Sequence, residues 1–139
     1  MLKNFLLVCT LLFISCGSKI DQEQLHLLNG YWEIKEVTFK DGAKKEYSIN
    51  STVDYISLDS LKGFRKKVSP KFNGTFETSN DAEPLFIRIS NDSVFMNYAT
   101  ELNTWEEVLL SLSEKSFSVK NNQGIIYTYE RFEPININP

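Results

Sequence analysis

The sequence predicts an all-β protein, an antiparallel up-and-down β-barrel of about 8–10 strands. Three observations lead to this fold class. From Gly30 onward, turn-forming residues interrupt the chain every eight to twelve residues, the segments between them are rich in aromatic and β-branched residues, and no window keeps a helical period. Short strands with tight connections pair with their neighbours along the chain, and the sheet must close or stack to hide its edges.

Residues 1–15 are predicted to be a secretory signal segment. Lys3 is the only charge before Cys16, and the apolar run after it is too short for a bilayer core, which takes about 20 residues. The stretch Phe13-Ile14-Ser15-Cys16-Gly17 resembles the bacterial lipoprotein signal box, which implies that cleavage leaves Cys16 as the acylated first residue. A buried apolar helix and an uncleaved amino-terminal anchor are the alternatives for this segment.

The resemblance implies an outer-membrane lipoprotein of the cell envelope, either periplasmic or surface-facing, because Gly17 is not the aspartate that retains some lipoproteins in the inner membrane. Removal of residues 1–15 leaves 124 of the 139 residues, enough for one domain. The expected organisation is a lipidated tether over 16–28, a barrel domain over 29–134 and a tail over 135–139. Within the tether, Leu25, Leu27 and Leu28 predict a helical turn over one end of the core.

The charge, cysteine and histidine content and one pair of glutamates argue against several functions. The net charge of −3 does not favour nucleic acid as a partner. No disulfide is expected, since Cys9 leaves with the signal segment and Cys16 is acylated. His26 is the only histidine and is read as a linker residue, so no metal and no cofactor are predicted. Glu106 and Glu107 are adjacent on a strand and face opposite ways, so they do not form a catalytic pair, and an enzyme is not expected.

Nine segments between the turns fit strands. In chain order they are residues 31–39, 53–58, 63–68, 74–78, 85–89, 94–99, 105–112, 117–120 and 125–132. The turn sequences that separate them include Lys40-Asp41-Gly42, Asn50-Ser51, Asp59-Ser60, Ser79-Asn80-Asp81, Ser90-Asn91-Asp92, Ser113-Glu114-Lys115 and Asn121-Asn122-Gln123-Gly124. Two of the turns continue into Asp59-Ser60-Leu61 and Asp92-Ser93-Val94, which resemble an O-glycosylation sequon of Bacteroidetes secreted proteins; chance matches of three residues are the alternative.

The first strand begins with Gly30-Tyr31-Trp32, and this Gly-x-Trp resembles the start of lipocalin and lipocalin-like barrels. The stretch 28–134 is similar to the small lipocalin-like lipoproteins of the Bacteroidetes. The resemblance implies that Trp32 closes the barrel floor and that Arg131, beside the last strand, packs over it. A guanidinium over an indole face contributes roughly 0.5–2 kcal/mol, and its donors can cap strand-end carbonyls.

The candidates for a ligand site are several aromatic residues and one basic segment. Tyr98, Trp105, Tyr127 and Tyr129 lie on expected strands, where they line an apolar cavity or fill a packed core. The segment 62–71 carries five cations and no acid. Alternation places Phe64, Lys66 and Val68 on one face, so Lys66 enters the barrel as a ligand contact if that face points inward. The alternatives are a solvated edge strand or a bulge near Gly63 that turns Lys66 outward.

The leading functional hypothesis is a membrane-anchored barrel that binds a small apolar or amphipathic ligand. The alternative is a packed barrel whose outer surface binds another envelope protein, as an inhibitor or assembly factor does. A lined cavity favours the first hypothesis, and a filled core with an exposed aromatic patch favours the second.

Overall fold

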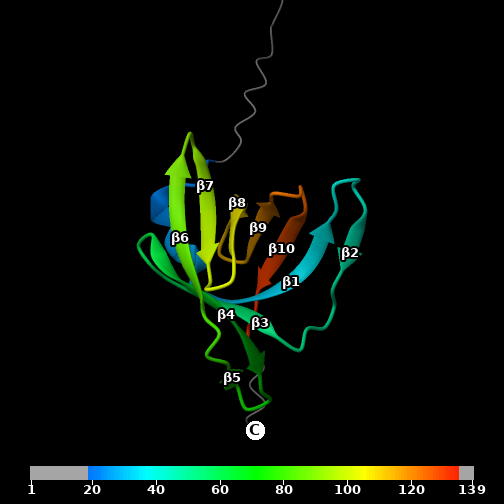
Figure 1. Ribbon diagram of the computed structural model, residues 1–139. Helices are drawn as coiled ribbons and strands as arrows, with labels where there is room; N and C mark the ends of the chain where they lie inside the picture. Colours follow the sequence, from blue (N-terminus) through cyan, green and yellow to red (C-terminus); the bar gives the residue numbers. More distant parts are fainter. Residues whose placement is uncertain (1–18, 135–139) are drawn as a thin grey trace, which may run out of the picture.

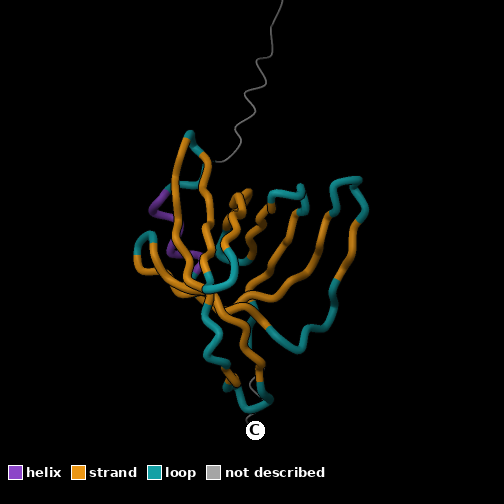
Figure 2. The backbone as a smooth tube through the Cα atoms, in the orientation of Figure 1, coloured by secondary structure: helices purple, strands orange, loops and turns teal. Residues whose placement is uncertain are grey.

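The computed structural model describes residues 19–134, and these residues form an all-β structure with one short helical segment (Figure 1, Figure 2). The 3-10 helix η1 spans Gln22–Leu28. Ten strands follow: β1 (Gly30–Thr38), β2 (Lys44–Glu46), β3 (Val53–Asp59), β4 (Lys62–Pro70), β5 (Phe76–Thr78), β6 (Glu83–Ser90), β7 (Ser93–Ala99), β8 (Thr104–Leu112), β9 (Ser116–Asn121) and β10 (Ile126–Arg131). No helix in this part of the chain is long and apolar enough to cross a membrane.

Eight of the strands form a closed ring in chain order. The ring runs in the order β1, β3, β4, β6, β7, β8, β9 and β10, and each strand is hydrogen-bonded to the next. β10 also pairs with β1, which closes the ring. All of these pairings are antiparallel. Closure leaves no free edge along the ring, which is the physical reason for a barrel rather than an open meander. The predicted all-β, up-and-down barrel is confirmed.

Two short strands lie outside the ring. β2 pairs with the end of β1, at Glu36, Val37 and Thr38, whereas the start of β1 pairs with β3. β5 pairs with the end of β4, beyond the stretch that pairs with β6, and forms a hairpin that projects from the barrel at the bottom of Figure 1. β2 is not predicted by the sequence, because Lys44, Lys45 and Glu46 are all exposed and carry no alternating pattern.

The two ends of the barrel differ. At the closed end, η1 packs against β3 and β8 and places Leu25 and Leu28 in the core, as predicted for the helical turn. The turns β3–β4, β6–β7 and β8–β9 lie at this end. Asn91 and Asp92 both adopt positive φ between β6 and β7, which suits a two-residue hairpin turn. The opposite end of the barrel, called the polar end because buried charged residues lie near it, carries the loops β1–β2, β7–β8 and β9–β10.

Candidate functional site

The barrel interior is divided into an apolar part and a polar part. The apolar part is filled by buried side chains, and those less than 2% exposed include Leu28, Trp32, Ile56, Leu85, Met96, Val94 and Val119. The polar part contains Asp54 and Glu107, the two buried charged residues of the described chain. The half of the barrel next to η1 is therefore packed with apolar side chains, and the buried charged groups lie toward the polar end.

Trp32 and Arg131 lie together at the closed end. They are direct cross-strand partners in the β1–β10 pairing, and the Arg131 guanidinium carbon is 4.2 Å from the centre of the fully buried indole ring. Arg131 also donates to the carbonyl oxygens of Leu27 (2.7 Å) and Asn29 (2.9 Å). A Cβ at Gly30 would lie 2.5 Å from Arg131 Nη1, so glycine is needed for this approach.

A cavity of about 380 Å³ lies at the polar end. The residues that line this polar-end pocket come from β4, β8, β9, β10 and the β9–β10 loop: Arg65, Trp105, Glu106, Glu107, Asn121, Asn122, Gln123, Tyr127 and Tyr129. The structure thus brings together Trp105, Tyr127 and Tyr129, three of the aromatic residues singled out in the sequence. Tyr98 lies next to them, since its ring stacks on Trp105 with centroids 5.1 Å apart.

Arg65 on β4 is a cation that points into the barrel. Its guanidinium carbon lies 4.2 Å from the centre of the Tyr98 ring, and Nη1 donates to the Tyr98 hydroxyl at 3.4 Å. Nε and Nη2 donate to one oxygen of Glu83 at 3.0 and 2.8 Å. Burial acts to lower the pKa of Arg65, but Tyr98 and the nearby carboxylates raise it above its ordinary value, so the guanidinium stays charged.

Glu107 is a buried carboxylate that faces the same pocket. Its side chain is 10% exposed, and its nearest cationic atom is Arg65 Nη1, 3.7 Å away and beyond hydrogen-bond distance. Burial raises the pKa of Glu107 above its ordinary value, while the Arg65 guanidinium and the Trp105 side chain oppose that rise. Glu107 therefore has a weaker ion pair with Arg65 than Glu83 has. A further cation next to Glu107 would stabilise its charged form.

The prediction that Lys66 enters the barrel is wrong. Lys66 pairs with Tyr55, and Arg65 pairs with Ile56, which is 1% exposed and belongs to the core. Directly paired residues share a face of the sheet, so Arg65 points inward and Lys66 outward. The alternation of β4 was read correctly, but its inward face was assigned to the other set of residues.

The sequence pattern does not show which face of β4 points inward, because the outer face is also partly buried. Phe64 and Lys66 lie on this face, with the Lys66 ammonium 5.8 Å from the Phe64 ring centre. An outer aromatic cluster covers it, formed by Tyr31, Tyr55, Phe64, Phe76 and Phe132, in which Tyr31 stacks on Phe76 with centroids 4.0 Å apart. Val53 and Val68 pair across β3 and β4. Both are buried, with 2% exposure, but they do not belong to the main core. Phe64 therefore belongs to this cluster and does not line the pocket.

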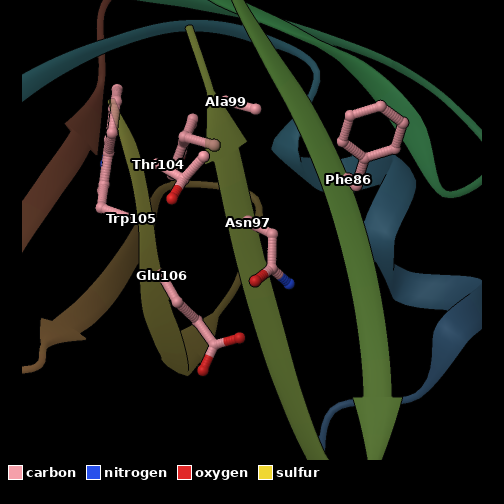
Figure 3. A pocket seen from close by; sticks show the side chains of 7 residues that line it. Phe86, Asn97, Ala99, Thr104, Trp105 and Glu106 are labelled. Atoms are coloured by element: carbon pink, nitrogen blue, oxygen red, sulfur yellow. The ribbon is translucent and has the colours of Figure 1, made fainter. Parts of the chain in front are cut away.

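The acidic partners of the pocket were not predicted from the sequence. Glu106 and Glu107 were expected to face opposite ways on β8, and they do. Figure 3 shows Glu106 and Trp105 on different sides of β8. Glu106 accepts a hydrogen bond from Arg88 at 3.0 Å, whereas Glu107 is buried. The alternation of Trp105, Glu107 and Leu109 carries the signal that Glu107 points inward.

A second cavity lies toward the outer surface. It has a volume of about 370 Å³ and is lined by Phe86, Asn97, Tyr98, Ala99, Thr104, Trp105 and Glu106, from β6, β7 and β8 (Figure 3). Phe86 is 45% exposed and Glu106 is already paired with Arg88. This cavity lacks the buried charged groups of the polar-end pocket, so the polar-end pocket is the stronger candidate for a binding site.

The remaining predicted residues give no second site. Within residues 19–134, no group of three or more metal-ligating side chains comes together. His26 is exposed on η1 and its Nδ1 lies 2.6 Å from the carbonyl oxygen of Glu23. Ser60 is exposed in the β3–β4 turn, and Ser93 is half-buried at the start of β7. Cys16 and the signal segment lie outside the described residues.

Two solved structures resemble this chain at low sequence identity. One is a lipocalin-like protein from Bacteroides uniformis ATCC 8492, with 12% identity and a TM-score of 0.49. The other is an uncharacterized protein from Bacteroides eggerthii DSM 20697, with 11% identity and a TM-score of 0.46. Each likeness covers 76% of this chain and 99% of the other. No protein-family model and no curated protein matches the sequence.

Proposed function

We propose that the protein is an envelope lipoprotein, anchored to the outer membrane through Cys16, whose barrel binds a small amphipathic molecule in the polar-end pocket. The anchor is supported by the signal-like layout of residues 1–17. The observation that carries the binding function is the pocket of about 380 Å³, which is lined both by the aromatic residues Trp105, Tyr127 and Tyr129 and by the charged residues Arg65 and Glu107.

This combination suits a ligand of one or two rings. Small-molecule sites are concave and combine apolar or aromatic walls with a few convergent polar groups that fix orientation. The exposed lining of this pocket is more polar than apolar, which favours an amphipathic ligand over a purely apolar one. A cavity of about 380 Å³ is at the small end of the usual range, and the apolar half of the barrel below it is filled. The ligand therefore lies at the polar end, in contact with Trp105 and Tyr127, and does not extend a long acyl chain down the barrel axis.

The test is equilibrium dialysis of 2-naphthol, a neutral two-ring amphipathic probe, against the full chain held in lipid nanodiscs. Empty nanodiscs measure the partition of the probe into lipid. We expect saturable binding of one molecule per chain, weakened about tenfold by Trp105→Ala, because loss of an aromatic wall removes stacking and apolar contact. Lys66→Met, a change on the outer face of β4, serves as the matched control and leaves the affinity unchanged.

Absence of binding above the empty nanodiscs overturns the proposed function and leaves a packed barrel that acts through its outer surface. Equal affinity in the wild type and the Trp105→Ala variant places the probe elsewhere on the molecule, and it also overturns the proposal. Trp105 lines both cavities, whereas Phe86 lines only the second cavity. Weakened binding in the Trp105→Ala variant with unchanged binding in Phe86→Ala supports the polar-end pocket, and equal weakening in both variants overturns it.

A further inference from the structure

The charges around the polar-end pocket do not balance. Apart from Glu106, which is paired with Arg88, five charged side chains meet at this end: Asp54 on β3, Arg65 and Lys67 on β4, Glu83 on β6 and Glu107 on β8. Lys67 Nζ donates to Asp54 at 2.9 Å, so this pair is neutral. Arg65 is shared between two carboxylates and gives its close hydrogen bonds to Glu83. One negative charge therefore remains on the group formed by Arg65, Glu83 and Glu107.

The excess charge lies on a residue that faces the pocket. Glu107 lines the cavity, whereas Glu83 does not. The Glu107 side chain is nine-tenths buried and 3.7 Å from the nearest guanidinium nitrogen. A buried carboxylate without a hydrogen-bonded cation is costly, and the pocket offers space in which such a cation can approach it.

The walls of the pocket also favour positive charge. Trp105, Tyr127 and Tyr129 line the cavity beside Glu107, and the faces of such rings attract cations through their quadrupoles. Arg65 already makes this kind of contact with Tyr98 within the protein. A ligand cation that approaches Glu107 can therefore be paired by the carboxylate and held against aromatic faces.

We propose that the polar-end pocket binds a small organic cation with a planar apolar portion, an amine or amidine, and that Glu107 is its counter-ion. This inference rests on the proposed binding function and specifies the charge of the ligand. A cation brings the group of Arg65, Glu83 and Glu107 to neutrality, whereas a carboxylate ligand raises its excess negative charge to two. Anionic amphiphiles such as fatty acids are therefore excluded as preferred ligands.

Three probes of one shape and different charge test the inference: benzamidine, which is a cation at pH 7, benzamide, which is neutral, and benzoate, which is an anion. Each is titrated into the full chain in lipid nanodiscs, and binding is followed by tryptophan emission. Trp105 lines the pocket, and Trp32 is fully buried at the closed end and supplies a constant background. We expect benzamidine to bind at least tenfold more tightly than benzoate, with benzamide between them.

Glu107→Gln isolates the contribution of the carboxylate. The variant keeps the shape of the side chain and removes its charge, so benzamidine should lose about tenfold in affinity. Benzamide should bind within about twofold of its wild-type affinity, which shows that the variant pocket is intact. Glu33→Gln removes an equal charge from the outer face of β1, where Glu33 pairs with Lys35 at 2.9 Å, and it should leave the order of the three probes unchanged.

The outcomes separate the two proposals. Equal affinity for the three probes, or tightest binding of benzoate, overturns the cation inference and leaves the binding function standing. The same order of affinities in the wild type and the Glu107→Gln variant also overturns the inference, because the selectivity then comes from another group. Binding of none of the probes overturns the cation inference together with the proposed pocket.

Discussion

Trp32 and Arg131 face each other across the β1–β10 pairing, with the guanidinium carbon 4.2 Å from the indole centre. Arg131 joins the end of β10 to two other segments, since it donates to the carbonyls of Leu27 and Asn29 before β1 and to that of Glu114 in the β8–β9 turn. The contact therefore links the strands at which the barrel closes to the helix that covers its end. Its contribution is structural, because it is remote from the polar-end pocket.

The first prediction concerns the stability that this contact provides. Trp32→Ala should lower the free energy of unfolding by roughly 3–5 kcal/mol, because it removes a fully buried ring from a packed core. Arg131→Met should cost about 1–3 kcal/mol through the lost cation–π contact and unpaired carbonyls. Urea unfolding measures both changes. Arg88→Met is the control: Arg88 also lies over a ring, Phe95 at 4.0 Å, but is half exposed. A loss in the Arg88 variant as large as in the Arg131 variant contradicts the assignment.

The second prediction separates the two adjacent cations of β4. Arg65→Met should destabilise the fold by about 3 kcal/mol, because Glu83 and Glu107 lose their shared counter-ion in a partly buried site. Lys66→Met, on the outer face, should change stability by no more than about 0.5 kcal/mol. Thermal and urea unfolding of both variants provide the comparison. If the Lys66 variant proves the less stable of the two, the inward face of β4 is wrongly assigned.

The third prediction is a pH dependence that comes from Glu107. Its pKa in the folded state is raised above the ordinary value of 4.5, so the folded state keeps this proton at a pH where the unfolded chain has lost it. Stability from this group is therefore lost as the pH rises from about 4.5 through the raised pKa. Glu107→Gln should match the wild type near pH 4 and be more stable at pH 7. Unfolding in urea at a series of pH values measures the difference, and a gap that is constant with pH disproves the assignment.

The fourth prediction concerns the anchor. If Cys16 is acylated, metabolic labelling with a palmitate analogue should tag the wild-type protein and should not tag Cys16→Ala, since the lipid chains attach at this residue. Fractionation of the labelled cells should place the wild type with the outer membrane. Equal labelling of the two proteins would rule out Cys16 as the site of attachment.

The strand order was accessible from the sequence because local signals determine it. Turn residues and alternating aromatic and β-branched residues mark the eight strands of the ring, and antiparallel neighbours follow chain order. The strand β2 was not accessible, since its three exposed charged residues are held only by pairing with β1. The contact of Trp32 with Arg131 was expected from a family resemblance and not from periodicity.

The candidate site was harder to predict from the sequence than the strand order, because the orientation of β4 could not be inferred from alternation. A strand with one buried face reveals its orientation through alternation, but β4 packs on both faces. Phe64 and Val68 lie toward the outer aromatic cluster, so the apolar set of β4 points away from the barrel, while Arg65 sits inside on Tyr98. Only the tertiary position of the β4–β5 hairpin, which brings Phe76 over this face, decides between the two orientations.

The β1–β10 seam also governs when the protein can fold. The hydrogen bonds from Arg131 to Asn29 and Leu27 span 102 and 104 residues, so the ring is complete only after the last strand is available. Closure of so long a loop makes folding slow compared with that of proteins rich in local contacts. A chain still under synthesis, with β10 not yet released, cannot close its barrel. If the proposed export takes place, the chain can be delivered to the translocation machinery in an open form and needs no active unfolding.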